Sequence, residues 1–341
     1  MPRWPGGLIR KTPVTPGGPF QCGAAPGVWS LADASYWTKQ GLWPIAGNVL
    51  DGTFAIFALG TNQATNQATN TRNKYTYSGC AVSSATAATA NSVFGAAAGN
   101  STVGIFALGA APSASTTRNK YTYSGCVVSA ATASTAVSRN GYAAGNSTVG
   151  VFALGYDGSF NATTTRNKYT YSGDTNAAGG ASTVASSSGA AVGNSTIGIF
   201  ALSLTTGCST TTARNKYTYS NCAVASATAA TAAAYSGSAA GTSTVGIFAL
   251  GNGGGTARNK YTYSSDVVSA GGAATAANYA GAAAGNSSVG IFALGIVGGV
   301  RVTTRDKYTY AGCVVSAGGA ATFASGCGRA ATSNGISGIT I

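Results

Sequence analysis

The chain has 341 residues, only 7% of them charged, and a formal net charge of +13. It contains no His and no Glu, and its six Asp residues do not recur as pairs at a fixed short spacing. Because acid–base catalysis and metal centres need suitable ligands grouped together, we expect no enzyme activity, no catalytic residues, no metal and no other cofactor.

The first segment, residues 1–27, is rich in Pro and Gly, which predicts an extended arm. Trp4, Leu8, Ile9 and Phe20 give this arm apolar anchors. We interpret it as a docking arm that a partner surface orders, with an unordered tail as the alternative. The segment lacks the pattern of a signal peptide, and no apolar run in the chain reaches the roughly eighteen residues of a membrane span. We therefore expect a soluble, unprocessed chain without membrane insertion.

The second segment, residues 28–43, holds three of the four Trp residues of the chain. Its sequence Ser30-Leu31-Ala32-Asp33 resembles a capping box, which predicts a short helix around residues 31–40. Trp29 is a further docking candidate, and Val28-Trp29 precedes the repeats where an outer strand would lie. We expect this Trp-rich connector to differ in role from the rest of the chain, because it occurs only once.

The remainder, residues 44–341, is organised around a six-residue sequence that recurs every 44 to 48 residues. It reads Arg-Asn-Lys-Tyr-Thr-Tyr five times, and the last copy has Asp in place of Asn. The copies are Arg72–Tyr77, Arg118–Tyr123, Arg166–Tyr171, Arg214–Tyr219, Arg258–Tyr263 and Arg305–Tyr310. A regular interval of this length is typical of repeat architectures. The alternation of side chains within each copy predicts a strand.

One complete unit starts near Ala96 and predicts about four strands. Gly99-Asn100 is a tight-turn signal, and Ile105–Leu108 is apolar on both faces, as in a buried strand. The Arg118–Tyr123 strand follows a variable loop, and Val127–Ser129 adds a short strand after it. About four strands in roughly 47 residues is the content of one propeller blade. The sequence therefore predicts an all-β chain that folds as a β-propeller.

The number of blades depends on how the chain ends are counted. Phe57, Phe106 and Phe292 are equivalent positions of the units, and Thr340 lies 48 residues beyond Phe292. We therefore expect about seven four-stranded blades, the seventh closed by strands from both ends of the chain. Six complete blades with the C-terminal strand as an accessory are the alternative.

The repeated side chains are interpreted as structural. We expect the repeated Tyr and Phe to form a continuous core between blades, and the repeated Arg and Lys to lie along neighbouring blades. Twelve of the nineteen basic residues belong to the repeated strands. Their positive charge is thus spread around the ring, so we expect no nucleic-acid partner.

The cysteines also follow the repeat. Four of the seven lie just after the repeated strand, where two units have Asp174 and Asp266 instead. A position that accepts either residue is interpreted as a loop position. The odd number and the absence of paired spacings favour free thiols in a reducing cytoplasm.

The unit running from Ala96 through Gly109 to Arg118–Tyr123 and Val127-Val128 resembles the kelch-type blade, although most units lack the second Gly of its Gly-Gly pair and all lack its outer-strand Trp. The repeats, preceded by Ala25–Leu31 and Lys39–Pro44, also resemble structural proteins of tailed bacteriophages. That resemblance implies a non-enzymatic virion protein of the tail, baseplate or fibre, assembled in the host cytoplasm in multiple copies. Other virion proteins, and a host surface glycan or receptor, are the implied partners.

The loops before the repeated strand vary in length and content, and loops on a rigid scaffold often carry recognition. Tyr156, Asp157 and Asn161 are the loop residues we select as recognition candidates. A carbohydrate-binding, lectin-like propeller for host-surface recognition is the alternative function. A sialidase-type hydrolase is a third hypothesis, which the missing Glu and the missing Asp-box pattern argue against.

Overall fold

The computed structural model describes residues 52–110, 112–328 and 330–335, and the regular structure of these residues is β-strand apart from two short 3-10 turns, η1 (Thr206–Cys208) and η2 (Ala311–Cys313). The docking arm, the connector with its expected helix at 31–40, and the docking candidates Trp4, Leu8, Ile9, Phe20 and Trp29 lie outside the described residues.

The described strands form six four-stranded antiparallel sheets and three smaller ones. From the inner to the outer strand, sheet 1 contains β31 (Ala331–Ser333), β1 (Phe54–Ala58), β3 (Arg72–Thr76) and β4 (Ala81–Ala85), and sheet 2 contains β5 (Ala96–Gly99), β6 (Val103–Ala107), β7 (Arg118–Thr122) and β8 (Val127–Ala131). Sheet 3 contains β9 (Tyr142–Gly145), β10 (Val149–Ala153), β11 (Arg166–Thr170) and β12 (Thr175–Ala178), and sheet 4 contains β14 (Ala190–Gly193), β15 (Ile197–Ala201), β17 (Arg214–Thr218) and β18 (Val224–Ala227). Sheet 5 contains β19 (Ser238–Gly241), β20 (Val245–Ala249), β21 (Arg258–Thr262) and β22 (Val267–Ala270), and sheet 6 contains β24 (Ala282–Gly285), β25 (Val289–Ala293), β28 (Arg305–Thr309) and β29 (Val314–Ala317).

The smaller sheets are built from the loops that join these strands. They pair β2 (Gly60–Asn62) with β30 (Ser325–Cys327), β13 (Ser186–Ser187) with β16 (Leu204–Thr205), and β23 (Asn278–Tyr279) with β26 (Ile296–Val297) and β27 (Val300–Arg301).

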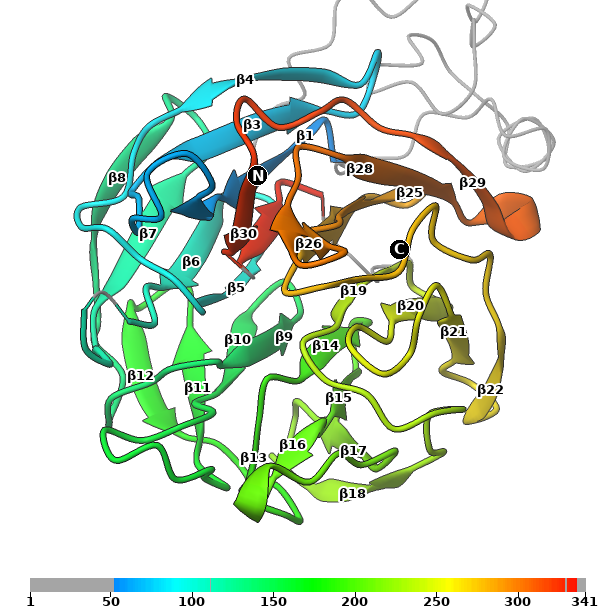
Figure 1. Ribbon diagram of the computed structural model, residues 1–341. Coiled ribbons are helices and arrows are strands. Elements are labelled where there is room, and N and C mark those ends of the chain that lie inside the picture. Colours follow the sequence, from blue (N-terminus) through cyan, green and yellow to red (C-terminus); the bar gives the residue numbers. More distant parts are fainter. Residues whose placement is uncertain (1–51, 111, 329, 336–341) are drawn as a thin grey trace, which may run out of the picture. The chain divides into compact units, whose positions relative to one another are not determined.

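The six large sheets follow one another around a ring in a propeller-like arrangement (Figure 1). Each inner strand contacts the next, from β31 to β5, β9, β14, β19, β24 and back to β31. Because this cycle closes with six sheets, the expectation of about seven is wrong for the described residues, and the alternative count of six is correct.

The first sheet shows why the count went wrong. In the other five units the inner strand precedes the second strand in the sequence, but β1 receives its inner strand from the other end of the repeats. Ala331 of β31 pairs with Phe57, just as Ala97 pairs with Phe106 in sheet 2. β31 is therefore the inner strand of sheet 1. Val28-Trp29 and residues 337–341, the expected closing strands, lie outside the described residues.

The same turn chemistry recurs between the first two strands of the units. In sheet 2, Asn100 Oδ1 accepts the backbone N–H groups of Thr102 and Val103, both at 2.9 Å. In sheet 1, Asn334 Oδ1 accepts the N–H of Phe54 at 2.9 Å, although the two residues are 280 positions apart. The predicted Gly-Asn turn is confirmed. In sheet 1 the equivalent Asn side chain, that of Asn334, joins the two ends of the repeats.

The core lies between neighbouring sheets, as predicted. Ala96, Ala98 and Ile105 of sheet 2 pack with Phe152 and Tyr169 of sheet 3 in one buried cluster. Equivalent clusters fill the other junctions. Stability of each sheet therefore depends on its two neighbours.

Gly104 is fixed by the close approach of one side chain from its own sheet and one from sheet 1. A Cβ atom at this position would lie 2.8 Å from Tyr123 Oη and 2.4 Å from Thr332 Cγ2. The residue at this position of the second strand therefore cannot carry a side chain, because Tyr123 and Thr332 of β31 occupy the space.

Candidate functional site

The repeated Arg-Asn pair links each sheet to the next. Arg118 is 1% exposed, and its guanidinium carbon lies 4.6 Å from the centre of the Phe152 ring in the following sheet. Its Nη2 donates a hydrogen bond to Asn167 Oδ1, also in that sheet, at 3.1 Å. The same pairing occurs at all six junctions: Arg72 with Phe106 and Asn119, Arg166 with Phe200 and Asn215, Arg214 with Phe248 and Asn259, Arg258 with Phe292 and Asp306, and Arg305 with Phe57 and Asn73. We call this set the latch ring.

Each latch also ties down a loop of the preceding unit. Asn167 Oδ1 accepts the backbone N–H of Thr135 at 3.0 Å, and Asn167 Nδ2 donates to Thr135 Oγ1 at 2.8 Å. Burial lowers the pKa of Arg118 to about 10, so its guanidinium stays charged at neutral pH. The predicted contact of repeated Arg side chains with neighbouring sheets is confirmed, and these buried cations are unavailable to a ligand.

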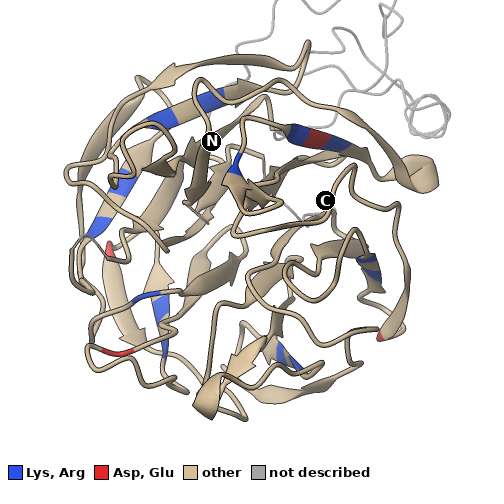
Figure 2. Cartoon of the chain, in the orientation of Figure 1, with Lys and Arg blue, Asp and Glu red and all other residues tan. Residues whose placement is uncertain are grey.

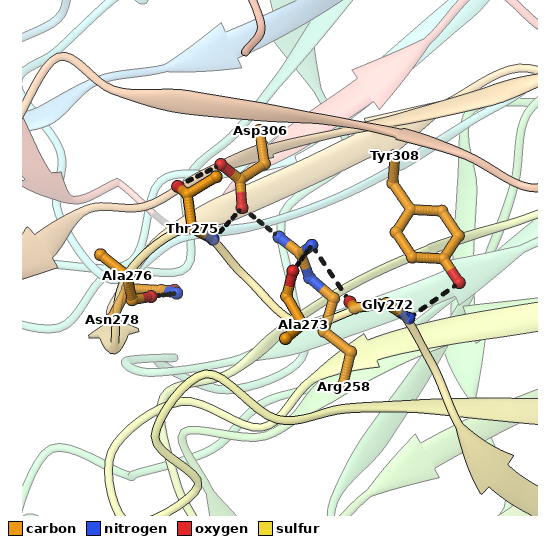
Figure 3. A network of polar contacts seen from close by, with 8 residues as sticks. All are labelled: Arg258, Gly272, Ala273, Thr275, Ala276, Asn278, Asp306 and Tyr308. Carbon is orange, nitrogen blue, oxygen red and sulfur yellow. Dashed lines mark hydrogen bonds and ion pairs between the residues drawn. The ribbon is translucent and has the colours of Figure 1, made fainter. Parts of the chain in front are cut away.

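One latch differs from the other five. Asp306 replaces Asn between sheets 5 and 6 and forms a fully buried ion pair with Arg258 Nη2 at 2.7 Å (Figure 3). Asp306 Oδ2 also accepts the Thr275 backbone N–H at 3.1 Å, while Asp306 Oδ1 accepts the Thr275 hydroxyl at 2.6 Å. A carboxylate cannot donate, so the Thr hydroxyl donates here instead of accepting.

The repeated Lys side chains lie nearer the rim. Lys120 Nζ lies 3.3 Å from Asp174 of the next sheet, and Lys216 Nζ lies 3.2 Å from Asp266. In the equivalent place, Lys168 Nζ donates to the Tyr219 carbonyl at 3.1 Å and lies 3.7 Å from Cys222 Sγ. Figure 2 shows the basic residues distributed over the sheets.

The Cys or Asp after each repeated strand occupies a turn, as predicted. Its backbone is left-handed in every unit, with φ between 47° and 60°. Burial alone would raise the pKa of Asp174, but hydrogen bonds from Thr132, Tyr169 and Lys120 outweigh it and lower this pKa to about 2. Cys80, Cys126, Cys208, Cys222 and Cys313 are free thiols.

The axis of the ring holds a cavity of about 110 Å³. All six inner strands line it, chiefly with Ala and Gly, and none of the described lining residues is charged. Alanine methyl groups offer shape but no directed polar contacts. The described lining therefore supplies no charged side chain, although Asn146, Ser238 and Thr332 contribute polar groups.

The predicted recognition residues Tyr156, Asp157 and Asn161 lie together in one loop of sheet 3. Asp157 Oδ1 accepts the backbone N–H groups of Ser159 and Asn161 at 2.8 and 2.9 Å. These hydrogen bonds lower the pKa of Asp157, and the bond from the Asn161 N–H has the largest effect. Asp157 and Asn161 thus shape the loop itself, and Tyr156, half-buried, packs against Phe160 with ring centres 6.5 Å apart.

The structure adds three residues that the sequence reasoning missed. Phe160 is 62% exposed at the tip of the same loop. The Arg139 guanidinium carbon lies 4.7 Å from the centre of the Phe160 ring and 4.9 Å from that of Phe94. We call Phe94, Arg139 and Phe160 the aromatic clamp. The clamp could have been found in the sequence as a departure from the repeat. Arg139 occupies the position that is Val93, Ser187, Tyr235 or Tyr279 in other units.

Within the described ranges, no group of three or more Cys or Asp side chains is placed to hold a metal ion. The same part of the chain contains no helix of the length and apolar character needed to cross a membrane. No family model matches the chain, and no curated protein matches it.

Proposed function

We propose that this protein is a non-enzymatic structural component of a tailed-phage particle, of the tail, baseplate or fibre type. In this proposal the ring is a six-bladed, kelch-like β-propeller, residues 1–27 dock it to other virion proteins, and its loops contact the host surface or a neighbouring subunit. The protein would be present in multiple copies per particle and assembled in the host cytoplasm.

The observation that carries the proposal is the division between a repeated interior and varied loops. The latch ring uses the repeated Arg and Asn side chains entirely for sheet-to-sheet contacts. The loops between second and third strands differ from unit to unit, and one of them carries the exposed Phe160. A rigid scaffold with varied loops suits binding more than catalysis.

The test is incorporation into particles. Deleting residues 1–27 is expected to abolish incorporation while leaving the circular dichroism spectrum and the thermal unfolding of the ring unchanged. A matched control, Val127→Ala, should be incorporated normally, because this exposed side chain lies on the outer strand β8, outside the arm and the variable loops. Normal incorporation of the deletion variant, or absence of the intact protein from purified particles, would refute the proposal.

A second candidate function is carbohydrate binding, and the aromatic clamp favours it. Exposed aromatic rings beside polar groups form sites that hold ligands with both apolar and hydrogen-bonding faces. Sugars have this character. A glycan array probed with the purified chain tests this candidate, and the absence of any signal would remove it.

A further inference from the structure

We propose that the aromatic clamp and the pocket beside it bind an acidic sugar, a pyranose bearing a carboxylate. This proposal deepens the proposed function, on which it rests for its biological setting, because it names the ligand class of the loop surface.

Arg139 differs from the latch arginines in having no partner for its charge. Outside the repeated strands, Arg139 and Arg301 are the two basic residues in the part of the chain that the structure describes. No described carboxylate pairs with Arg139, and its guanidinium makes no hydrogen bond to a described residue. A guanidinium is a planar fork of N–H donors that matches a carboxylate.

The clamp holds this fork in place. Phe94 and Phe160 lie 4.9 and 4.7 Å from the guanidinium carbon, which restricts its motion. The backbone of Arg139 is also fixed, since its N–H and carbonyl both pair with Tyr156, at 3.2 and 2.8 Å. A donor held in advance loses less conformational entropy when it binds. The stacking thus prepares Arg139 for an anion.

A pocket of about 370 Å³ borders Arg139. This volume falls in the usual range for small-molecule sites, roughly 300–1,000 Å³. Gln67 and Asn91 contribute amide groups to its lining, and Val93 and Pro112 contribute apolar surface. Amides both donate and accept hydrogen bonds, as sugar hydroxyls do.

The exposed ring of Phe160 completes the match. The ring is 62% exposed, so it presents apolar surface to water, and covering that surface with a ligand is favourable. Phe160 does not line the pocket itself and adjoins it through Arg139, on which its ring stacks. One face of a pyranose consists of C–H groups, which suit the phenyl ring, and its hydroxyls suit the amides of the pocket. A simple anion such as phosphate would use Arg139 but leave the phenyl ring and the amides unused. The combination therefore favours a carboxylated sugar over a free inorganic anion.

The test is isothermal titration calorimetry on the purified full chain with four probes: trigalacturonate, neutral maltotriose, sodium acetate and inorganic phosphate. We expect trigalacturonate to bind and the other three to bind at least tenfold more weakly. Arg139→Gln should weaken trigalacturonate binding by roughly tenfold or more, because a charge-assisted pair is lost. Phe160→Ala should weaken it by about fivefold to tenfold through lost apolar burial.

Arg301→Gln is the matched control, since it removes the same charge from another loop and should leave the affinity unchanged. Circular dichroism of each variant confirms that the ring is folded. No binding of trigalacturonate, equal binding of acetate, phosphate or maltotriose, or an equal effect of Arg301→Gln would each overturn the proposal. These outcomes are independent of particle incorporation, so the site and the proposed function can fail separately.

Discussion

Replacing Asp306 with Asn tests whether hydrogen-bond geometry or charge holds the sheets of the ring together. The substitution makes the sixth latch identical in residue type to the other five. An Asn here could still accept from Arg258 Nη2 and from the Thr275 N–H, as Asn167 does from Arg118 and Thr135. Its amide could also donate to the Thr275 hydroxyl.

The change in the free energy of unfolding follows from the interactions that each substitution removes. A hydrogen bond to a charged group contributes about 1.5–3 kcal/mol, and a neutral one about 0.5–1.5 kcal/mol. Removing the buried carboxylate also removes its desolvation cost, which offsets much of that difference. We therefore expect Asp306→Asn to change the free energy of unfolding by no more than about 1 kcal/mol. Asp306→Ala should cost about 3–5 kcal/mol, because Arg258 then keeps a buried charge without its partner.

The assay is urea unfolding at pH 7 followed by far-ultraviolet circular dichroism, comparing midpoints and slopes. The reciprocal variant Asn259→Asp creates the same Arg–Asp pair one junction earlier and should also be nearly neutral. If Asp306→Asn destabilises the ring as much as Asp306→Ala does, charge rather than geometry holds the latch, and our reasoning is refuted.

Two further predictions concern the repeated Tyr residues and the acid range. Tyr123→Phe should cost about 1–2 kcal/mol, because its hydroxyl contacts Thr332 Oγ1 at 3.1 Å and donates to the Ser333 carbonyl at 3.0 Å. Tyr171→Phe should be neutral or stabilising in the same urea assay, since its buried hydroxyl has no hydrogen-bond partner among the described residues; equal losses for both variants would contradict this. Asp174, with its pKa lowered from 3.8 to about 2, contributes stability that is present above pH ~4 and lost as the pH falls toward 2. Because its side chain is 32% exposed, the loss should stay below about 1 kcal/mol, and an Asp174→Asn variant whose acid unfolding curve matches the unmodified protein would contradict the assignment.

Much of the fold was predictable because each unit repeats its own local signals. The Gly-Asn turns, the doubly apolar second strand and the Tyr-bearing third strand each follow from short-range chemistry. The six-sheet closure was harder, since β31 has only three residues and pairs with a strand at the other end of the repeats. Its equivalence to Ala97–Gly99 becomes clear only from the register with Phe57.

The candidate site was predicted in part. Sequence reasoning selected the loop of Tyr156, Asp157 and Asn161, and the aromatic clamp includes the tip of that loop. It missed Arg139 and Phe94, because these residues belong to two other connections. Arg139 contacts both Phe94 and Phe160 only in the folded ring. The alternation of side chains in the repeated strand places Arg and Asn on opposite faces. It does not show that neighbouring sheets cover both faces, so the burial of the repeated Arg could not be predicted from it.

The completion of sheet 1 by β31 has a consequence for synthesis in the cell. The ribosome makes Phe54 280 residues before Asn334, so the emerging polypeptide holds an unfinished sheet through most of translation. The inner edge of β1 then has unpaired backbone groups that other strands can join. A message cut short before the codons for residues 331–334 would yield a product whose ring stays open. Such products should aggregate or be degraded, so that only chains translated through β31 accumulate.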